Sequence, residues 1–498
     1  MTSPAACRAL FIAALLFVSP FVGGNAAAQD AVVFRREHVL GTSFHLAVHA
    51  TPEAAAKVET AIVREIDRLS LVLSTYDPKS EIERLSRPGA AQPASFDLRA
   101  VLRSAEFWME RSKGVFHPGV AVFADLWRQA AARGETPKDE DLASARKALP
   151  EHLWRVDDKA QTIDVLSAAH PTIDALAKGY ILDRAAEAGR AAGAADFVLM
   201  IGGDTVVSGT TPELLAVADP RTPADNAAPL GKIRVRGRAV ATSGAYARGV
   251  DILGKHYSHI FDPRTGRPAE AVLQATVVAP NAVDADAVAT ILSILAPPDG
   301  LAFVATLSRV DCLVVDRAGK QHASPGWAKL ALPADAVSAT PGPWPDHGEV
   351  AVRFEIAKPE SGGRGGYRRP YVAVWVEDVD DRPVRTLCLW VERERWIPDL
   401  RRWGRLYDGR YDEAAPVTRA TRAPGRYDLI WDGRDDRGNA LPRGAYTIVV
   451  EAVREHGGYE ILKLEVQVDG RTFEKTATGS GGELESAGAV YRTRKDAK

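Results

Sequence analysis

The chain contains little cysteine and no excess of charge of one sign. Three cysteines among 498 residues are too few for a disulfide framework. The formal net charge of −2 provides no basic field, which argues against nucleic acid as the main partner. No repeat occurs at the period of a solenoid. The remaining composition, with 46% hydrophobic and 26% charged residues, is typical of a soluble globular protein and excludes collagenous or wholly disordered chains.

Residues 1–28 have the pattern of a Sec-type signal peptide. One positive charge, Arg8, precedes the apolar stretch Leu10–Val18, and the small residues Ala26–Ala28 precede a polar start. The stretch is shorter than the roughly 20 residues of a comfortable membrane span, although an uncleaved anchor is the alternative. Cys7 lies ahead of the apolar core, so it is not placed as the lipid-bearing cysteine of a lipoprotein. We therefore expect a periplasmic or secreted mature protein.

The hydrophobic pattern divides the mature chain into three regions. Residues 31–332 mix strands with helices, of which Pro52–Leu73 is the longest, and they predict an α+β fold. Residues 333–348 are rich in proline, glycine and small side chains, and predict a linker. Residues 349–475 look like strands divided by turns and predict an all-β sandwich. Residues 476–498 lack periodicity, so we expect a disordered tail.

Two stretches carry residues suited to catalysis or metal binding. His259 lies in a loop, 258–268, that also contains an Asp-Pro turn, although it could be a structural histidine. Asp286 and Thr290 are four residues apart on an expected helix, Asp284–Leu295, and so share a face. A carboxylate and a hydroxyl suit a hard cation such as Mg²⁺. An aspartate in the first turn of a helix can equally be a cap.

Two glycine-containing stretches could meet a phosphate. Lys178 and Gly179 precede an expected helix, Tyr180–Ala192, and the segment Gly202–Asp204 follows an expected strand, Phe197–Ile201. A solvated lysine and a tight turn are the simpler explanations. The chain has neither a Walker motif nor a dinucleotide-binding fingerprint.

Together and in this order, these stretches resemble the ApbE-type flavin transferases, which are FAD:protein FMN transferases. The resemblance covers about Val33 to Leu332, and its most specific part is the loop His259–Pro268, with the pattern His-Ile-x-Asp-Pro-x-Thr-Gly-x-Pro. The other matching segments are Leu40–Thr42, Ser74–Tyr76, Gly114–Pro118, Ala177–Tyr180, Ile201–Asp204, Thr242–Gly244 and the helix with Asp286 and Thr290.

The resemblance implies an activity and a set of site residues. The activity is Mg²⁺-dependent transfer of the FMN half of FAD to a threonine or serine hydroxyl of an exported acceptor protein, with release of AMP. The acceptor could also bring the enzyme to a membrane. By position, His259 would be the catalytic residue, and the metal would be bound by Asp286, Thr290 and the carbonyl of Ala175. FAD would be bound by Leu40, Tyr76, Val115, Phe116, His117, Thr172, Lys178 and Ile260.

Two positions depart from the family pattern. His117 stands where an aspartate is usual, and Thr172 stands where a carboxylate is expected, with Asp174 two residues later. Both would touch FAD, which puts the affinity for FAD and the selectivity for adenine in question. Two other functions are therefore kept as alternatives: an FAD pyrophosphatase, in which water replaces the protein hydroxyl, and an FAD-binding or scaffold protein without turnover.

The C-terminal region resembles two periplasmic or extracellular modules more weakly. Residues 371–403 are similar to a bacterial periplasmic domain of unknown function (DUF2271), and residues 431–446 are similar to the closing hairpin of FlgD-type immunoglobulin-like modules. We therefore expect an immunoglobulin-like sandwich. Its aromatic side chains could bind an acceptor, whereas Trp375, Trp390 and Trp431 could instead fill the core.

Overall fold

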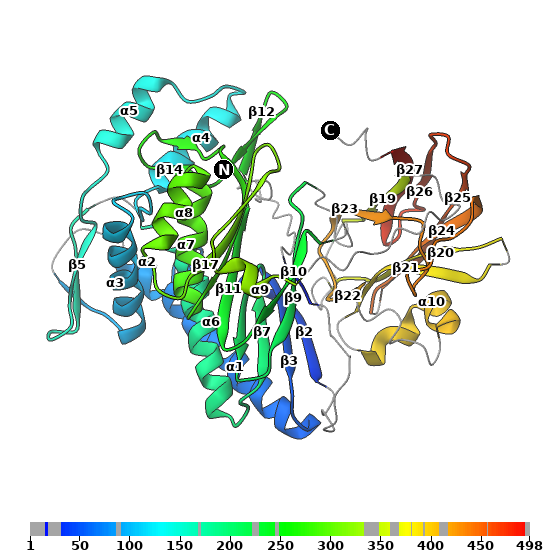
Figure 1. Cartoon of the computed structure of the whole chain (residues 1–498), viewed down its shortest axis with the longest axis horizontal. Helices are drawn as coiled ribbons and strands as arrows, with labels where there is room; N and C mark the ends of the chain where they lie inside the picture. Colours follow the sequence, from blue (N-terminus) through cyan, green and yellow to red (C-terminus); the bar gives the residue numbers. More distant parts are fainter. Residues whose placement is uncertain are drawn as a thin grey trace.

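The computed structural model contains an α+β part followed by a part rich in strands (Figure 1). Most of the predicted signal peptide and of the predicted linker lies outside the described residues. The exceptions are Gly348 and β1 (Leu15–Phe17), which pairs antiparallel with β9 (Glu213–Val217). The described residues are 15–17, 31–85, 91–167, 171–221, 229–244, 249–332, 348–358, 368–379, 381–391, 394–407, 417–455 and 457–493.

An eight-stranded antiparallel sheet forms the centre of the N-terminal part. Its order is β18-β17-β16-β11-β8-β7-β3-β2. The strands are β2 (Val32–Val39), β3 (Thr42–Val48), β7 (Phe197–Ile201), β8 (Asp204–Ser208), β11 (Arg238–Gly244), β16 (Val272–Ala279), β17 (Asp311–Asp316) and β18 (Gln321–Ala323).

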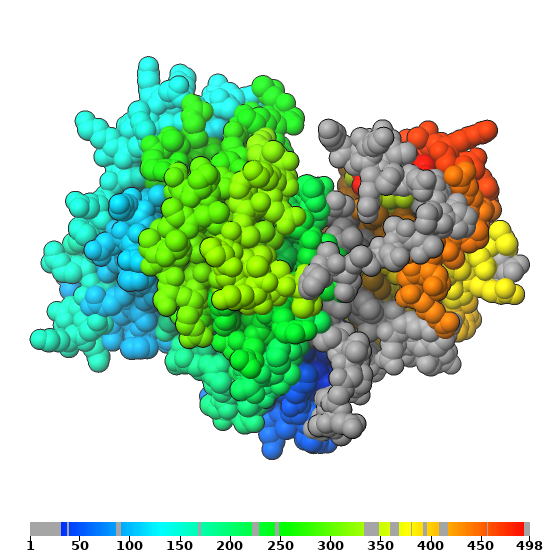
Figure 2. Space-filling view, in the orientation of Figure 1, coloured from blue at the N-terminus to red at the C-terminus, as the bar shows by residue number. Residues whose placement is uncertain are grey.

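Three helices cover one face of this sheet: α1 (Pro52–Leu73), α6 (Asp174–Ala191) and α7 (Ala282–Ile294) (Figure 1). Helix α1 begins as its sequence predicts, because Thr51 accepts a hydrogen bond from the amide of Ala54 and proline occupies the first turn. The apolar stripe of α1 faces the sheet. Helix α7 is buried nearly all round, and α8 (Pro297–Ala305) packs against it. The green and yellow-green segments of the N-terminal part form its surface on the side seen in Figure 2.

Shorter elements surround this central layer. A pair of strands, β9 and β10 (Gly231–Val235), and α9 (Trp327–Leu330) pack on the other face of the sheet. The remaining elements are α2 (Glu81–Leu85), α3 (Phe96–Arg111), α4 (Ala121–Ala132), α5 (Asp139–Lys147), β4 (Gln92–Pro93), β5 (Trp154–Asp157), β6 (Thr162–Val165), β12 (Gly249–Ile252), β13 (Lys255–Ser258), β14 (Phe261–Asp262) and β15 (Arg267–Pro268). No helix in the described ranges is both long and apolar enough to cross a bilayer.

Helices α6 and α7 approach each other at Gly179. A Cβ atom at this position would lie 2.3 Å from the carbonyl oxygen of Ala282, so only glycine fits against the backbone of α7. One turn further along α6, the carboxylate of Asp183 accepts hydrogen bonds from the amides of Ala282 and Val283, at 2.8 and 3.0 Å. The start of α7 is therefore fixed directly to α6.

The C-terminal part consists of two sheets that share one apolar core. Their orders are β22-β21-β20-β24-β25 and β23-β19-β27-β26. Trp375, Trp390 and Trp431 are 0% exposed, so none of them presents a binding face. Trp390 and Trp431 fill the core between the sheets, as one alternative predicted, whereas Trp375 packs in a second cluster with Trp403. The strands are β19 (Gly348–Ile356), β20 (Tyr371–Glu377), β21 (Pro383–Trp390), β22 (Thr418–Arg419), β23 (Gly425–Trp431), β24 (Gly444–Val453), β25 (Tyr459–Val468), β26 (Glu474–Thr478) and β27 (Leu484–Thr493), with α10 (Arg401–Leu406) on the outer side.

The prediction of a disordered tail from residue 476 is wrong for the described residues up to 493. Strand β27 lies between β19 and β26, and Leu484, Ala489 and Tyr491 point into the core. Two features hid this strand in the sequence. Two of its four inward side chains, Ala487 and Ala489, are small, and a bulge opposite Ile356 interrupts the alternation.

Replacing Gly179 with alanine tests the contact between α6 and α7. We expect Gly179→Ala to lower the free energy of unfolding by about 2 kcal/mol or more, because backbone atoms of α7 must move. Gly189→Ala is the matched control on the same helix, since its Cβ would meet only side-chain atoms of Ile62 and Phe197. Its effect should stay within about 1 kcal/mol, since alanine favours the helix. Equal losses in urea unfolding of the two variants would contradict this picture.

The carboxyl of Asp183 should make stability depend on pH. Burial raises its pKa to about 6, against an ordinary value of 3.8, although the amides of Ala282 and Val283 oppose the shift. The folded state therefore holds an extra proton between these pH values, and stability falls as the pH rises through them. Between pH 4 and 7 the wild type should lose on the order of 2 kcal/mol relative to Asp183→Asn.

Asp196→Asn is the control of opposite sign, because the amide of Thr211 helps to lower the pKa of Asp196. The wild type should therefore gain stability relative to Asp196→Asn as the pH rises. Urea unfolding across the pH range measures both, and a difference between wild type and Asp183→Asn that is constant with pH would contradict the raised pKa.

Candidate functional site

The register of the central sheet brings several of the predicted motifs to one end. Phe44 pairs with Ile201, and Ile201 pairs with Asp204, so the start of β3 lies beside the turn between β7 and β8. The amide of Gly202 in that turn donates to the carbonyl of Ser43 at 2.9 Å. The turn Leu40–Gly41, which precedes β3, therefore lies at the same end of the sheet as Gly202–Asp204.

Strand β11 runs toward this end as well. Val240 pairs with Thr205, so the later residues of β11 extend past the start of β8. The chain then forms the hairpin β12–β13 and enters the loop with His259. The predicted segment Thr242–Gly244 thus forms the end of β11, and the predicted loop His259–Pro268 comes after the hairpin that follows this strand.

The start of α6 is tied to two other predicted segments. The amide of Thr172 donates to the carbonyl of Pro118 at 2.6 Å, which brings the segment 115–118 beside it. The hydroxyls of Thr75 and Tyr76 donate to the two carboxylate oxygens of Asp174, at 3.1 and 3.2 Å. Thr172 and Tyr76, both predicted to bind FAD, therefore lie near the N-terminus of α6.

Helix α6 begins at Asp174 and not at Tyr180, which corrects the predicted start. Ala175 and Lys178 consequently lie within the first two turns of the helix rather than in a loop before it. No capping residue marks this start, because Ile173 precedes the helix and no side chain caps it.

A compact group of charged side chains lies where α6, α7 and β8 meet. The ammonium of Lys178 is 2.5 Å from a carboxylate oxygen of Asp204. The amide of Gly179 donates to Asp286 at 3.3 Å. Asp286 is only 3% exposed, and burial raises the pKa of its carboxyl. The ammonium of Lys178 opposes this rise, whereas the neighbouring carboxylates of Asp204 and Asp174 add to it.

Asp286 does not cap its helix. Helix α7 begins at Ala282, and the side chain of Asn281 caps it by accepting from the amide of Asp284 at 2.8 Å. Asp286 therefore lies in the second turn and not in the first. Thr290 follows one turn later on the same face and is half-buried. The capping alternative for Asp286 is thus wrong, and its buried carboxylate has no part in starting the helix.

The loop with His259 is fixed at both ends, while its histidine is exposed. His259 directly follows β13, and Ile260 is 8% exposed. The amide of Ile260 donates to the hydroxyl of Ser258 at 3.1 Å, and its carbonyl accepts from Ala269 at 2.7 Å. The indole of Trp127 donates to the carbonyl of Gly266 at 3.0 Å. A solvent-facing imidazole on a rigid loop is accessible to a second molecule.

Comparisons with known proteins identify the family of the N-terminal part. The model of the ApbE family matches residues 40–314. The chain belongs to the ApbE family. A second model, described as a predicted periplasmic protein (DUF2271), matches residues 349–486.

Curated relatives carry one common name, FAD:protein FMN transferase, and are therefore transferases. The Salmonella typhimurium protein is 28% identical over 305 residues, which are 58% of this chain and 86% of that protein. The Rhodobacter capsulatus protein is 30% identical over 275 residues, which are 53% of this chain and 51% of that protein.

Solved ApbE structures share the fold of the N-terminal part. The Thermotoga maritima ApbE protein aligns with a TM-score of 0.55 at 24% identity, over 61% of this chain and 100% of that one. The flavin transferase ApbE from Vibrio cholerae aligns with a TM-score of 0.52 at 23% identity, over 60% and 99%. An ApbE-like fold for the N-terminal part is thereby confirmed.

The side chain of His117, which departs from the family pattern, forms a hydrogen bond within its own loop. Its Nδ1 accepts the amide of Gly119 at 3.0 Å. Burial lowers the pKa of its imidazole, although a hydrogen bond with the backbone of Pro150 opposes this. An aspartate oxygen could accept the same amide two residues on, so the histidine can replace it in the turn.

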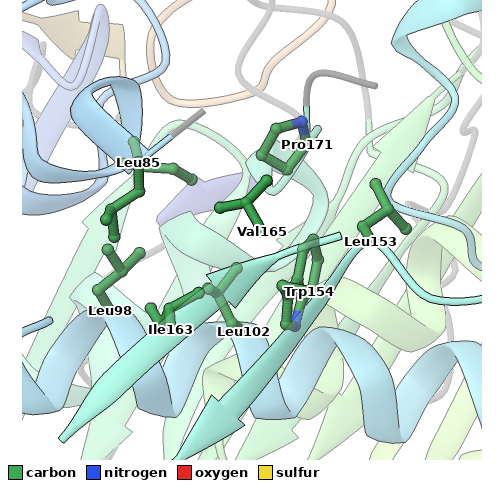
Figure 3. A pocket seen from close by; sticks show the side chains of 9 residues that line it. Leu85, Leu98, Leu102, Leu153, Trp154, Ile163, Val165 and Pro171 are labelled. Atoms are coloured by element: carbon green, nitrogen blue, oxygen red, sulfur yellow. The ribbon is translucent and has the colours of Figure 1, made fainter. Parts of the chain in front are cut away.

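A small apolar cavity lies beside this end of the ApbE part but does not contain the charged group. It has a volume of about 20 Å³, which is room for one water molecule. Figure 3 shows side chains of α2, α3, β5 and β6 turned toward it, with Pro171, next to Thr172, at its edge. Its lining is entirely apolar, so it is not the place for a diphosphate. The lining residues are Ile82, Leu85, Leu98, Leu102, Leu153, Trp154, Ile163, Val165 and Pro171.

Sequence reasoning assigned no role to two carboxylates of this site. Asp204 was part of a matching motif, and Asp174 was noted only as a displaced carboxylate. Their partners, Lys178 on α6 and the hydroxyls of Thr75 and Tyr76, are distant in the sequence. The one available signal was an acidic residue directly after a Gly-Gly turn that ends a buried strand.

Proposed function

We propose that this ApbE-family protein transfers the FMN half of FAD to a threonine or serine hydroxyl of an exported acceptor protein, with Mg²⁺, and releases AMP. The observation that carries the proposal is the group of Lys178, Asp204 and Asp286 at the end of the sheet where the other family motifs converge. The names of the curated relatives support the same reaction.

The residues present fit a divalent cation. Three carboxylates, those of Asp174, Asp204 and Asp286, act on one another with a single ammonium, that of Lys178, among them. The net negative charge of this group weakens the binding of a dianionic diphosphate, and a cation that accompanied the diphosphate would offset this charge. The proposed ligands are the carboxylate of Asp286, the hydroxyl of Thr290 and the carbonyl of Ala175, all oxygen donors of the kind Mg²⁺ prefers. When bound, the cation would offset charge on the diphosphate and on the departing phosphate.

No group of three or more His, Cys, Asp or Glu side chains in the described ranges is arranged to hold a metal. The proposed ligand set contains only one such side chain, that of Asp286. It is therefore not a group of that kind, and its proposal does not conflict with this finding. A site of this kind leaves room for phosphate oxygens and water in the coordination shell of Mg²⁺.

The proposed FAD-binding residues would act near the same end of the sheet. Lys178 would meet the diphosphate, as a lysine ammonium commonly does. The others would surround the rings and the ribose: Leu40, Tyr76, Val115, Phe116, His117, Thr172 and Ile260. Of these, Tyr76 is 84% exposed and offers an aromatic face to a ring system.

His259 would act on the acceptor. An imidazole is suited to take the proton of a hydroxyl near neutral pH. The acceptor oxygen then bonds to the phosphorus of the FMN half, the P–O bond of the diphosphate breaks, and AMP leaves with the electron pair. The flavin ring takes no part, so no oxidant or reductant is required.

We also propose how the chain is organised. A signal peptide, 1–28, would direct export, and the flavin transferase domain would span 31–332. A linker, 333–348, would lead to an immunoglobulin-like DUF2271 domain that extends to residue 493, because β27 completes its sheet. This organisation would place the protein in the periplasm or outside the cell. The description of the DUF2271 family as a predicted periplasmic protein supports this location.

Hydrolysis of FAD to FMN and AMP is the second candidate, because the exposed His259 is accessible to water as well as to a protein hydroxyl. Incubation with FAD, Mg²⁺ and an acceptor protein separates the two. Flavin fluorescence on the acceptor after denaturing electrophoresis indicates transfer, and free FMN with an unlabelled acceptor indicates hydrolysis. Retained FAD without AMP would instead indicate a binding protein.

Removing the proposed metal ligand should stop the reaction. We expect Asp286→Asn to reduce AMP release by about 100-fold or more, because several kcal/mol of charge stabilisation are lost. Chelation of Mg²⁺ should have the same effect on the wild type. Asp284→Asn is the control on the same helix, because Asp284 interacts with the capping Asn281. Near-normal turnover of Asp286→Asn with unchanged Mg²⁺ dependence would exclude the assignment.

Removing the proposed base should slow transfer without weakening FAD binding. His259→Ala is expected to lower the rate of acceptor labelling by roughly 10²–10⁴-fold, the usual contribution of a general base. The dissociation constant of FAD, measured by quenching of flavin fluorescence, should change by less than about twofold if the imidazole acts only in the transition state. His256→Ala, on the neighbouring strand β13, is the control. Equal losses in binding and in rate would make His259 a binding residue.

A further inference from the structure

The ion pair between Lys178 and Asp204 is asymmetric. The side chain of Asp204 is 2% exposed, whereas that of Lys178 is 33% exposed. The carboxylate is therefore enclosed by the protein, and the lysine remains accessible from solvent. In such a pair the buried carboxylate fixes the ammonium of Lys178 from the protein side. The solvent-facing side of the lysine stays accessible to a ligand.

The backbone around Asp204 is rigid. Asp204 is the first residue of β8 and follows the turn Gly202–Gly203. Gly202 adopts a left-handed φ of 62° against the side chain of Thr42, where a Cβ would lie 3.0 Å from the hydroxyl oxygen. The position of the carboxylate is thus set by the sheet and not by α6.

Lysine needs such a partner more than most side chains do. Its four-carbon stem has many rotamers, and holding the ammonium in one place costs conformational entropy. An ammonium has three N–H donors, so a hydrogen bond to Asp204 is compatible with bonds to phosphate oxygens. A lysine that is held in place before the ligand arrives spends less of the binding free energy on ordering.

We infer that Asp204 is a positioning residue that holds the ammonium of Lys178 where it meets the diphosphate of the dinucleotide. This inference rests on the proposed function. Asp204 acts on FAD binding through Lys178 and is a ligand of neither the substrate nor the cation, while its charge also reaches the carboxyl of Asp286. Its loss should therefore weaken FAD binding only as long as Lys178 is present.

A double-mutant cycle tests the inference. The variants are Asp204→Asn, Lys178→Gln and the double variant. Glutamine keeps a donor for the carboxylate, so Lys178→Gln does not leave a buried charge without a hydrogen bond. The first readout is the dissociation constant of FAD, measured by flavin fluorescence with EDTA present, so that neither Mg²⁺ nor turnover contributes.

Each single change should weaken FAD binding about tenfold, and the double variant should match Lys178→Gln within about twofold, because residues that act as a unit are not additive. Asp204→Glu should restore part of the affinity, since it keeps the carboxylate. Asp311→Asn is the control: Asp311 pairs with Arg238 at 3.1 Å on the same sheet, and its loss should leave FAD binding unchanged. Losses that multiply in the double variant would overturn the inference.

The second readout is the Mg²⁺ concentration that gives half-maximal transfer. It should change only slightly in Asp204→Asn, because the residue is not a ligand of the cation and acts on Asp286 only through its charge. An increased Mg²⁺ requirement together with unchanged FAD binding in EDTA would make Asp204 a metal ligand, and would likewise overturn the inference. Failure of the proposed function would appear differently, as a wild type that binds FAD but labels no acceptor.

Discussion

The close contact of α6 with α7 at Gly179 is the constraint on which the site depends. Because no side chain separates the two backbones, Lys178 and the amide of Gly179 on one helix lie beside Asp286 on the other. Asp183 secures the same contact by binding the first amides of α7. Both helices are held on one face of an antiparallel sheet whose turns carry the remaining motifs. The site is thus a consequence of how two helices cross.

The charge at this crossing explains why the fold suits a diphosphate substrate. A buried carboxylate is costly for a protein, and burial raises the pKa of Asp286, with a smaller contribution from the neighbouring carboxylates of Asp204 and Asp174. One ammonium offsets only part of this charge. In the proposed mechanism, a cation and an anionic ligand that bind together would offset this charge. The proposed role of His259 then requires that a hydroxyl approaches its exposed imidazole.

The sequence predicted the strands better than the helix starts. Strands such as Phe197–Ile201 and Tyr371–Glu377 agree with the structure because they are apolar runs between turn signals. The predicted start of α6 is too late because Ile173 offers no capping side chain. The sequence does not indicate strand β27 because a bulge interrupts its alternation and two of its inward residues are alanine. The order of motifs identified the family, but the pairing of Lys178 with Asp204 depends on a contact between distant segments, which no local pattern encodes.

The most direct test is to locate the cation. Crystals soaked with Mn²⁺ and ADP, whose diphosphate replaces that of FAD, can be measured at a wavelength where manganese scatters anomalously. A peak beside the carboxylate of Asp286 and the hydroxyl of Thr290, with the diphosphate next to Lys178, is the expected result. A well-occupied manganese peak elsewhere, with the diphosphate away from the crossing of α6 and α7, would contradict the proposed site.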